Sequence, residues 1–114
     1  MKKLLLTLLL STLTALSAYA QNMSYGGVKQ DIIIDVRTPA EFATGHIGGA
    51  VNIPLDQIGA GIPSGYKLRR DSRILLYCRS GQRSEAARKL LEKQGYLYVL
   101  NGGSIEDAQK NLKP

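Results

Sequence analysis

The sequence predicts an α/β fold, with a mostly parallel central sheet and helices on both faces. Short apolar runs rich in β-branched residues alternate with helix signals across short loops, the pattern of strand–helix–strand units. The runs Ile32–Ile34 and Ile74–Tyr77 are continuously apolar, as strands buried on both faces are. A chain of 114 residues, of which 44% are hydrophobic, can form one domain with one modest core.

The first twenty residues have the features of a secretory signal peptide. Lys2 and Lys3 form a basic start, Leu4–Leu16 is apolar, and Ala18-Tyr19-Ala20 has small residues where a signal peptidase cleaves. We therefore expect residues 1–20 to be removed and the protein to reside in the periplasm, without membrane contact after cleavage. An uncleaved anchor is the alternative, but the apolar run is short for one.

After the predicted signal peptide, we expect a flexible arm over residues 21–30 and a single domain over residues 31–114. The arm is polar and contains glycine without a periodic pattern. The domain begins with the strand Ile32–Ile34, which Asp35-Val36-Arg37 closes.

A short helix follows, and its start is the clearest local signal of the chain. Thr38 can cap it, Pro39 suits its first position, and Glu41 completes a capping box. Phe42 is expected to face the core, and Gly45 to end the helix.

The next elements lead to the third strand. We expect a short strand over Ala50–Pro54, one helical turn over Leu55–Ile58 and a loop over Gly59–Gly65. The strand Arg73–Tyr77 then carries Cys78 at its carboxyl end.

A helix over Ser84–Gln94 and a fourth strand over Tyr96–Leu100 complete the sheet. One helix face is expected to be apolar, and Gly95 is a typical residue after a helix end; the residues of that face are Ala86, Ala87, Leu90 and Leu91. Asn101-Gly102-Gly103 is typical of a turn, and Ser104 with Asp107 resembles a second capping box before a last helix.

The only cysteine, Cys78, lies between a buried strand and a polar loop that leads into a helix. Backbone N–H groups and a helix N-terminus can converge there, which favours a thiolate and holds an anion. Arg79 and Arg83 add two positive charges. A buried, inert cysteine is the alternative, but Cys78 has apolar neighbours on its N-terminal side only. The pattern therefore favours a nucleophilic thiolate with an anionic substrate.

Charge and composition limit the partners. The full sequence has a net charge of +6, and about +4 remains once Lys2 and Lys3 are removed, which suits small anionic substrates. No basic face interleaved with aromatic residues is visible, so we expect no nucleic-acid binding; Asp71 lies within the cluster of Arg69, Arg70 and Arg73, which favours a solvated turn. The sole histidine, His46, has no neighbouring cysteine or carboxylate cluster, so we expect no metal and no cofactor. A monomer is expected.

Three motifs in the same order resemble the single-domain rhodanese-like sulfurtransferases. The first runs from Asp35 through Phe42 and from Gly45 to Pro54, the second is Cys78–Ser84, and the third runs from Gly95 to Gly103. Together they cover nearly all of residues 32–108. The resemblance implies the rhodanese-like fold and a thiosulfate sulfurtransferase that passes sulfur to cyanide or a thiol.

The same resemblance assigns the site residues. Cys78 would be the nucleophile and carry the persulfide, and the loop after it would bind the substrate through Arg79, Ser80, Gly81, Gln82, Arg83 and Ser84. Arg79 and Arg83 would orient the sulfonate end of thiosulfate. The resemblance implies a structural role for His46. From their own positions, Asp35 and Arg37 are expected to hold the loop after the first strand, and Glu41 to cap the helix.

Two further functions remain open. A persulfide carrier that hands sulfur to a partner protein would need the same cysteine and loop. A phosphatase or arsenate reductase is disfavoured, because the related phosphatases have a longer loop than the six residues from Cys78 to Arg83.

Overall fold

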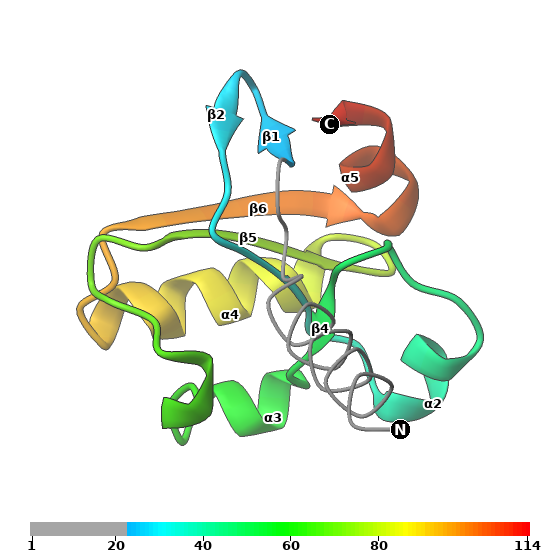
Figure 1. Cartoon of the computed structure of the whole chain (residues 1–114). Coiled ribbons are helices and arrows are strands. Elements are labelled where there is room, and N and C mark those ends of the chain that lie inside the picture. The colour runs from blue at the N-terminus through cyan, green and yellow to red at the C-terminus, as the bar shows by residue number, and fades with distance from the viewer. Residues whose placement is uncertain (1–22) are drawn as a thin grey trace, which may run out of the picture.

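A four-stranded parallel sheet forms the centre of the molecule, with strand order β4-β3-β5-β6 (Figure 1). The computed structural model describes residues 23–114, so the predicted signal peptide and its cleavage after Ala20 lie outside the described residues. The strands are β3 (Ile32–Asp35), β4 (Val51–Asn52), β5 (Arg73–Cys78) and β6 (Tyr98–Ser104). The predicted α/β fold with a parallel sheet is confirmed.

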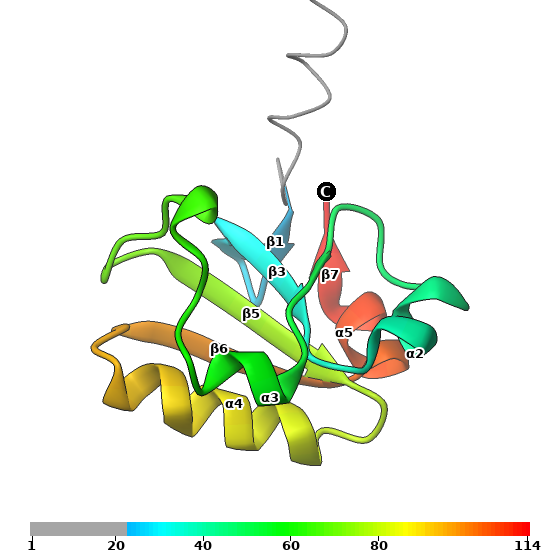
Figure 2. The ribbon, with the colours of Figure 1, turned by 90° about the horizontal axis from the view of Figure 1, so that it is seen from below.

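Helices cover both faces of this sheet. On one face, α3 (Leu55–Ile58) and α4 (Gln82–Lys93) lie side by side, as Figure 2 shows from below. The other face carries α5 (Ile105–Asn111) and a small antiparallel sheet. The apolar runs of β3 and β5 alternate between the two faces, so each face has its own buried cluster. The helices α2 (Pro39–Ala43) and η1 (Ser64–Tyr66) lie in the connections.

The expectation of a flexible arm is wrong for residues 24–29, which form a hairpin. Its strands are β1 (Ser24–Tyr25) and β2 (Val28–Lys29), and β1 also pairs with β7 (Leu112–Lys113) near the C-terminus. Gly26 and Gly27 both have positive φ, as the tightest hairpin turns require. That glycine pair was the available signal, but the pairing with β7 has no local signature.

The helix α2 begins as predicted and packs differently. Both hydrogen bonds of the capping box between Thr38 and Glu41 are present, and Gly45 follows the last turn. Phe42 does not face the core, because α2 buries none of its residues. Its ring stacks instead on the His46 ring, with 3.6 Å between the centroids.

The second half of the chain contains two corrections. Ala86 of α4 is exposed, and the buried positions are Ser84, Ala87 and Leu91. Residues 101–103 continue β6 instead of forming a turn. A side chain at Gly102 would come within 3.0 Å of the Leu76 carbonyl oxygen, so glycine serves close packing there. The helix α5 is capped as predicted, by Ser104.

Candidate active site

Cys78 ends β5 at the carboxyl edge of the sheet, where the chain turns into α4. Gly81 makes this turn, with a φ of 92° that side chains rarely adopt. A Cβ at Gly81 would also approach the Gly103 Cα to 3.3 Å, so the loop packs closely on β6. This turn lets the Gly81 N–H donate to the Cys78 Sγ, with 2.9 Å between nitrogen and sulfur.

The sulfur lies in a polar cradle beneath the loop. Cys78 has no exposed surface, and the Ser84 Oγ lies 3.4 Å from its Sγ. Burial alone would raise the pKa of the Cys78 thiol. Hydrogen bonds from the Ser84 hydroxyl and from the N–H groups of Ser84, Ser80 and Gly81 outweigh burial, so the pKa lies below its ordinary value. The site therefore stabilises the thiolate more than water stabilises that of an ordinary cysteine.

The sequence predicts this lowered pKa but places the cause partly elsewhere. It assigns the effect to backbone N–H groups of the loop, to the helix N-terminus and to Arg79 and Arg83, and it does not include the Ser84 hydroxyl. In the structure, the largest lowering contributions are hydrogen bonds from the loop and from the first turn of α4. The attraction between Arg83 and Cys78 adds to them.

Asn101 is a site residue that the sequence analysis missed. Its Oδ1 accepts from the Ser84 hydroxyl at 2.6 Å and from the Gly103 N–H at 2.9 Å, and its Nδ2 donates to the Gly81 carbonyl at 3.1 Å. It thereby ties the loop to β6. A polar residue inside the strand that pairs with β5 could have indicated this role. The sequence pattern Asn101-Gly102-Gly103 was instead typical of a turn, which placed Asn101 outside the strand.

The Ser84 hydroxyl has one proton and three acceptors within reach, the Asn101 Oδ1, the Gly81 carbonyl oxygen and the Cys78 sulfur. When Cys78 ionises, donation to the sulfur becomes the stronger hydrogen bond, because the acceptor is charged. Asn101 Oδ1 still keeps the Gly103 N–H. The Ser84 hydroxyl can thus donate to Asn101 Oδ1 when the thiol is neutral and to the sulfur when it is ionised. Asn101 Oδ1 keeps a hydrogen bond in both states.

Replacing Ser84 by alanine should raise the pKa of Cys78, because the thiolate loses a donor. The rate of alkylation by iodoacetamide, measured against pH, reports this pKa. Ser80→Ala is the matched control, because the contribution of Ser80 comes from its backbone N–H, which the substitution keeps. An unchanged profile for Ser84→Ala would contradict a hydrogen bond from the Ser84 hydroxyl to the thiolate.

The two predicted anion-binding arginines differ in the structure. Arg79 is exposed, and no ion pair or hydrogen bond links it to the other residues in the 23–114 range. Arg83 pairs with both carboxylate oxygens of Glu41, at 2.7 and 3.0 Å. This pair, with the Thr38 N–H next in importance, lowers the pKa of Glu41 to about 2. Glu41 therefore caps α2 and also holds the loop arginine.

The remaining loop residues Ser80 and Gln82 are exposed, whereas Ser84 is buried. His46 is exposed, and its Nδ1 lies 2.9 Å from the Phe42 carbonyl oxygen, a contact within its own segment. Within residues 23–114, no group of three or more His, Cys, Asp or Glu side chains could hold a metal ion. No helix of that segment is long and apolar enough to cross a membrane.

A buried ion pair supports the site from the end of β3. Arg37 Nη2 lies 2.7 Å from Asp35 Oδ2 and also donates to the Gly45 carbonyl at 2.7 Å. Hydrogen bonding to Asp35 raises the pKa of Arg37. Tyr77, next to Cys78, accepts the Ile47 N–H on its hydroxyl oxygen. These contacts hold the segment after β3 and the segment after α2 against the carboxyl edge of the sheet.

Comparisons with known proteins agree with this architecture. The model of the rhodanese-like domain matches residues 16–107. The chain is 35% identical over 74 residues to the thiosulfate sulfurtransferase PspE of Escherichia coli (strain K12), covering 65% of this chain and 70% of that protein. It is 40% identical over 83 residues to a sulfurtransferase of Allochromatium vinosum, covering 71% and 75%.

Solved structures show the same likeness. A rhodanese with anions from E. coli superposes with a TM-score of 0.61 at 33% identity, covering 66% of this chain and 87% of that one. A human single-domain sulfurtransferase, TSTD1, has the same TM-score at 22% identity and covers 89% of each chain, which shows the shared fold.

Proposed function

Because this chain belongs to the rhodanese-like family, we propose that it is a thiosulfate sulfurtransferase that carries sulfur as a persulfide on Cys78. The observation that carries the proposal is the Cys78 sulfur, held by the Gly81 N–H and the Ser84 hydroxyl at the carboxyl edge of the sheet. Such donors lower the pKa of the Cys78 thiol, which raises the share of the nucleophilic thiolate at neutral pH. The likeness to a thiosulfate sulfurtransferase of E. coli supports the choice of donor.

The reaction proceeds in two displacements. The Cys78 thiolate attacks the outer sulfur of thiosulfate, the S–S bond of thiosulfate breaks, and sulfite leaves with the electron pair. The persulfide keeps one negative charge on its terminal sulfur. Cyanide then attacks that sulfur, thiocyanate leaves, and the thiolate returns; a thiol acceptor would leave as a persulfide. The loop N–H groups stabilise the charged sulfur throughout.

Access to the sulfur needs a small movement of the loop. Cys78 is fully buried in this conformation, so we propose that the loop after it moves before a donor reaches Sγ. Arg79 and Ser80 are exposed at this point. We propose that the exposed Arg79 meets the sulfonate end of the donor.

The test is mass spectrometry of the purified protein before and after thiosulfate, together with a sulfite assay. We expect a gain of about 32 Da on Cys78, one sulfur atom, release of sulfite, and loss of the added mass on treatment with cyanide. Turnover of aryl phosphates without sulfite release would overturn the proposal. A stable persulfide that no small acceptor discharges would favour a sulfur carrier instead, a role named for the putative carrier YrkF of Bacillus subtilis, 38% identical over 69 residues.

Replacing Glu41 by glutamine should lower the thiosulfate KM. The change removes the carboxylate that neutralises Arg83, and the amide oxygen can still accept the Thr38 N–H. The site then attracts a dianion more strongly, most clearly at low salt. Glu92→Gln is the matched control, since it changes the same charge on the exposed side of α4 beside Arg88. Equal KM values for the two variants would show that Arg83 does not act on the donor.

Export to the periplasm is part of the same proposal. It rests on the basic start, the apolar run and the Ala18-Tyr19-Ala20 site of the sequence. N-terminal sequencing of protein recovered from the periplasm of a bacterial host should give Gln21 as the first residue. An intact Met1 on the recovered protein would contradict it.

A further inference from the structure

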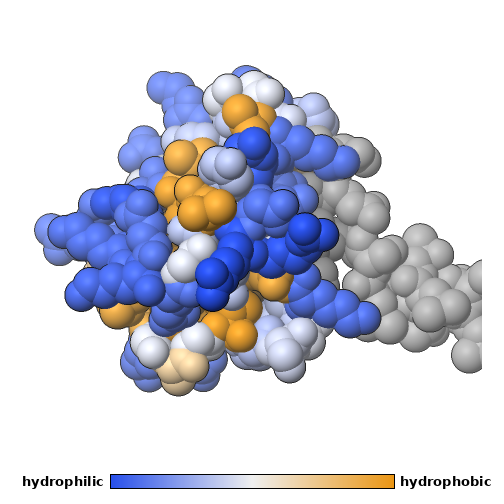
Figure 3. Space-filling view, turned by 90° about the vertical axis from the view of Figure 1, so that its left-hand side faces the viewer, coloured by the Kyte–Doolittle hydropathy of each residue, from blue (hydrophilic) through white to orange (hydrophobic). Residues whose placement is uncertain are grey.

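The exposed large hydrophobic side chains of residues 23–114 gather at one place, away from the active site. They are Val28 of β2, Leu97, and Tyr98 and Leu100 of β6, with exposed fractions of 39%, 65%, 44% and 41%. All four line one hollow of about 270 Å³, together with Gln30 and Arg73. Figure 3 views this end of the molecule, where apolar side chains gather among hydrophilic ones. Such clustering is characteristic of binding surfaces.

The hollow exists because one face of the central sheet is only partly covered. This is the face that carries α5 and the small antiparallel sheet. Along β6, Val99 packs in the cluster of α4, so Tyr98 and Leu100 point to the opposite face. There α5 covers Gly102, and β1 packs over the middle of the sheet. The start of β6 is left open, and β6 is also an edge strand.

Gln30 marks the hollow as a polar site as well as an apolar one. It is 98% buried, since only 2% of its surface is exposed, and its Nε2 donates to the Val28 carbonyl at 3.0 Å. Its Oε1 is the one buried side-chain oxygen or nitrogen of the described chain without a hydrogen-bond partner. An unpaired buried acceptor costs about 1–3 kcal/mol. A donor brought by a bound molecule would remove this cost.

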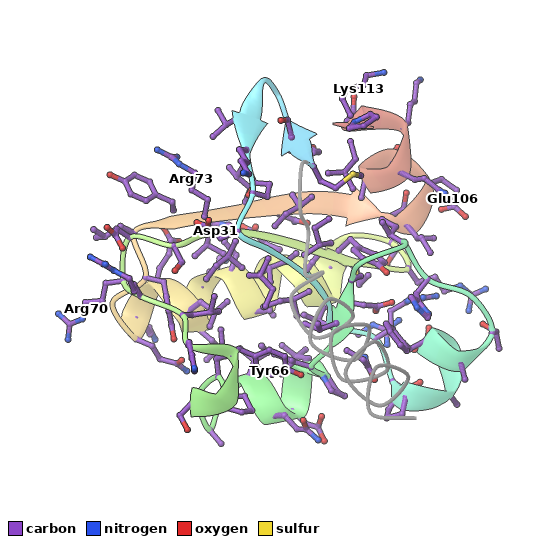
Figure 4. The ribbon with its side chains drawn as sticks, viewed as in Figure 1. Asp31, Tyr66, Arg70, Arg73, Glu106 and Lys113 are labelled. Atoms are coloured by element: carbon purple, nitrogen blue, oxygen red, sulfur yellow. The ribbon has the colours of Figure 1, made fainter. Side chains whose placement is uncertain are left out.

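Two arginines and one carboxylate, that of Asp31, lie around the hollow. The Arg73 guanidinium lies over the Tyr98 ring, 4.5 Å from its centroid, and its backbone N–H donates to the Asp31 carboxylate. Arg70 is joined through its carbonyl to the Leu97 N–H. Over residues 23–114, neither guanidinium pairs with a carboxylate, and Figure 4 shows both side chains pointing outward at this end.

The apolar walls, Gln30 and the arginines together indicate what kind of molecule binds in the hollow. Two copies of this chain meeting through the same patch would set Arg70 and Arg73 against their equivalents. A stable dimer also needs about 800 Å² from each partner, more than a hollow formed by a few half-exposed side chains offers. A segment with one apolar side chain, a free backbone N–H and a nearby carboxylate fits the apolar walls, Gln30 and the arginines together.

We propose that the hollow between β2 and β6 binds an acidic, apolar peptide segment of a partner protein. Its apolar side chain packs between Val28 and Leu100, its N–H pairs with the Gln30 Oε1, and its carboxylate pairs with Arg73. Arg73 and Cys78 lie at opposite ends of β5, about 17 Å apart along the strand. The partner therefore leaves the active-site loop free, and the surface positions the enzyme on another protein.

Selection of a displayed random-peptide library on the purified wild-type protein tests the proposal. We expect the enriched peptides to carry a large apolar residue next to Asp or Glu. Measured by fluorescence polarisation, their affinity should fall about tenfold or more for Leu97→Ser, Leu100→Ser and Arg73→Glu. Lys89→Glu on the exposed face of α4 is the control and should bind as the wild type does. Leu97 is the most exposed of the four, so Leu97→Ser spares the fold if Leu100→Ser does not.

Three outcomes would overturn the proposal: enriched peptides without acidic residues, equal binding by the patch variants and Lys89→Glu, or no enrichment at all. A wild-type dimer in sedimentation that Leu97→Ser makes monomeric would also overturn it, because a second copy would then occupy the hollow. Sulfur transfer should be unchanged in every patch variant. A chain without thiosulfate activity would not affect the peptide result, so the two proposals fail separately.

Discussion

Replacing Cys78 by serine should reduce sulfur transfer about 1000-fold or more, because a serine hydroxyl cannot form a persulfide. Cys78 is the only cysteine, so no second thiol can substitute for it. The fold should be kept. The sulfur already contacts the Gly81 N–H and the Ser84 hydroxyl, and a serine oxygen can accept from either.

Sulfite release from thiosulfate and the mass of the protein after incubation measure this effect, and the melting temperature checks the fold. Lys89→Ala, on the exposed face of α4, is the control for general effects of substitution. Sulfite release by Cys78→Ser at a rate near that of the wild type would show that Cys78 is not the sulfur carrier. In that case the polar cradle around it would only satisfy a buried thiol.

The parts of the site that the sequence predicts are those with local causes. The capping box of Thr38 and Glu41 involves neighbours along the chain, and both of its hydrogen bonds form. The cysteine at a strand end before a helix is equally local, and β5 and α4 place it as expected. Such features can be predicted from sequence because they depend on residues close together in the chain and not on tertiary contacts.

The parts that the sequence misses depend on partners far along the chain. Arg83 and Glu41 are 42 positions apart, and either pattern alone indicates only an anion ligand or a helix cap. Asn101 of β6 accepts a hydrogen bond from the hydroxyl of Ser84 in α4, which lies 17 positions earlier in the chain. Gly102 resembles a turn residue, yet it serves close packing against Leu76. The sequence shows which residue occupies each of these positions. Only the folded structure shows which distant residue it contacts and why that residue type is needed.

The same distinction applies to the second surface of the molecule. The sequence analysis interpreted Arg69, Arg70 and Arg73 as a solvated turn. Arg69 fits this interpretation, since it pairs with Asp71 on the surface. Arg73 does not, because the strand start brings its guanidinium over the Tyr98 ring of β6. A cluster of charges in sequence therefore separates in space into one solvated pair, Arg69 with Asp71, and two arginines at the end of the molecule that carries the apolar hollow.

Replacing Asp35 by alanine should destabilise the protein by about 3–5 kcal/mol, the usual cost of leaving one member of a buried ion pair alone. Asp35 is fully buried and accepts from the Arg37 backbone N–H as well as from its guanidinium. A domain of this size has a total stability of roughly 5–15 kcal/mol. The loss is therefore a large fraction of the free energy of unfolding.

Urea unfolding followed by circular dichroism measures this loss, and Asp71→Ala provides the matched control. Asp71 pairs with Arg69 where both side chains are mostly exposed, so its removal should cost less than about 1 kcal/mol. Adding Arg37→Leu to Asp35→Ala should recover part of the stability, because the buried cation is then gone. Equal stabilities for Asp35→Ala and Asp71→Ala would show that water solvates Arg37 once Asp35 is lost. The loop between β3 and α2, which presents Glu41 to Arg83, would then be held by its cap and not by the buried pair.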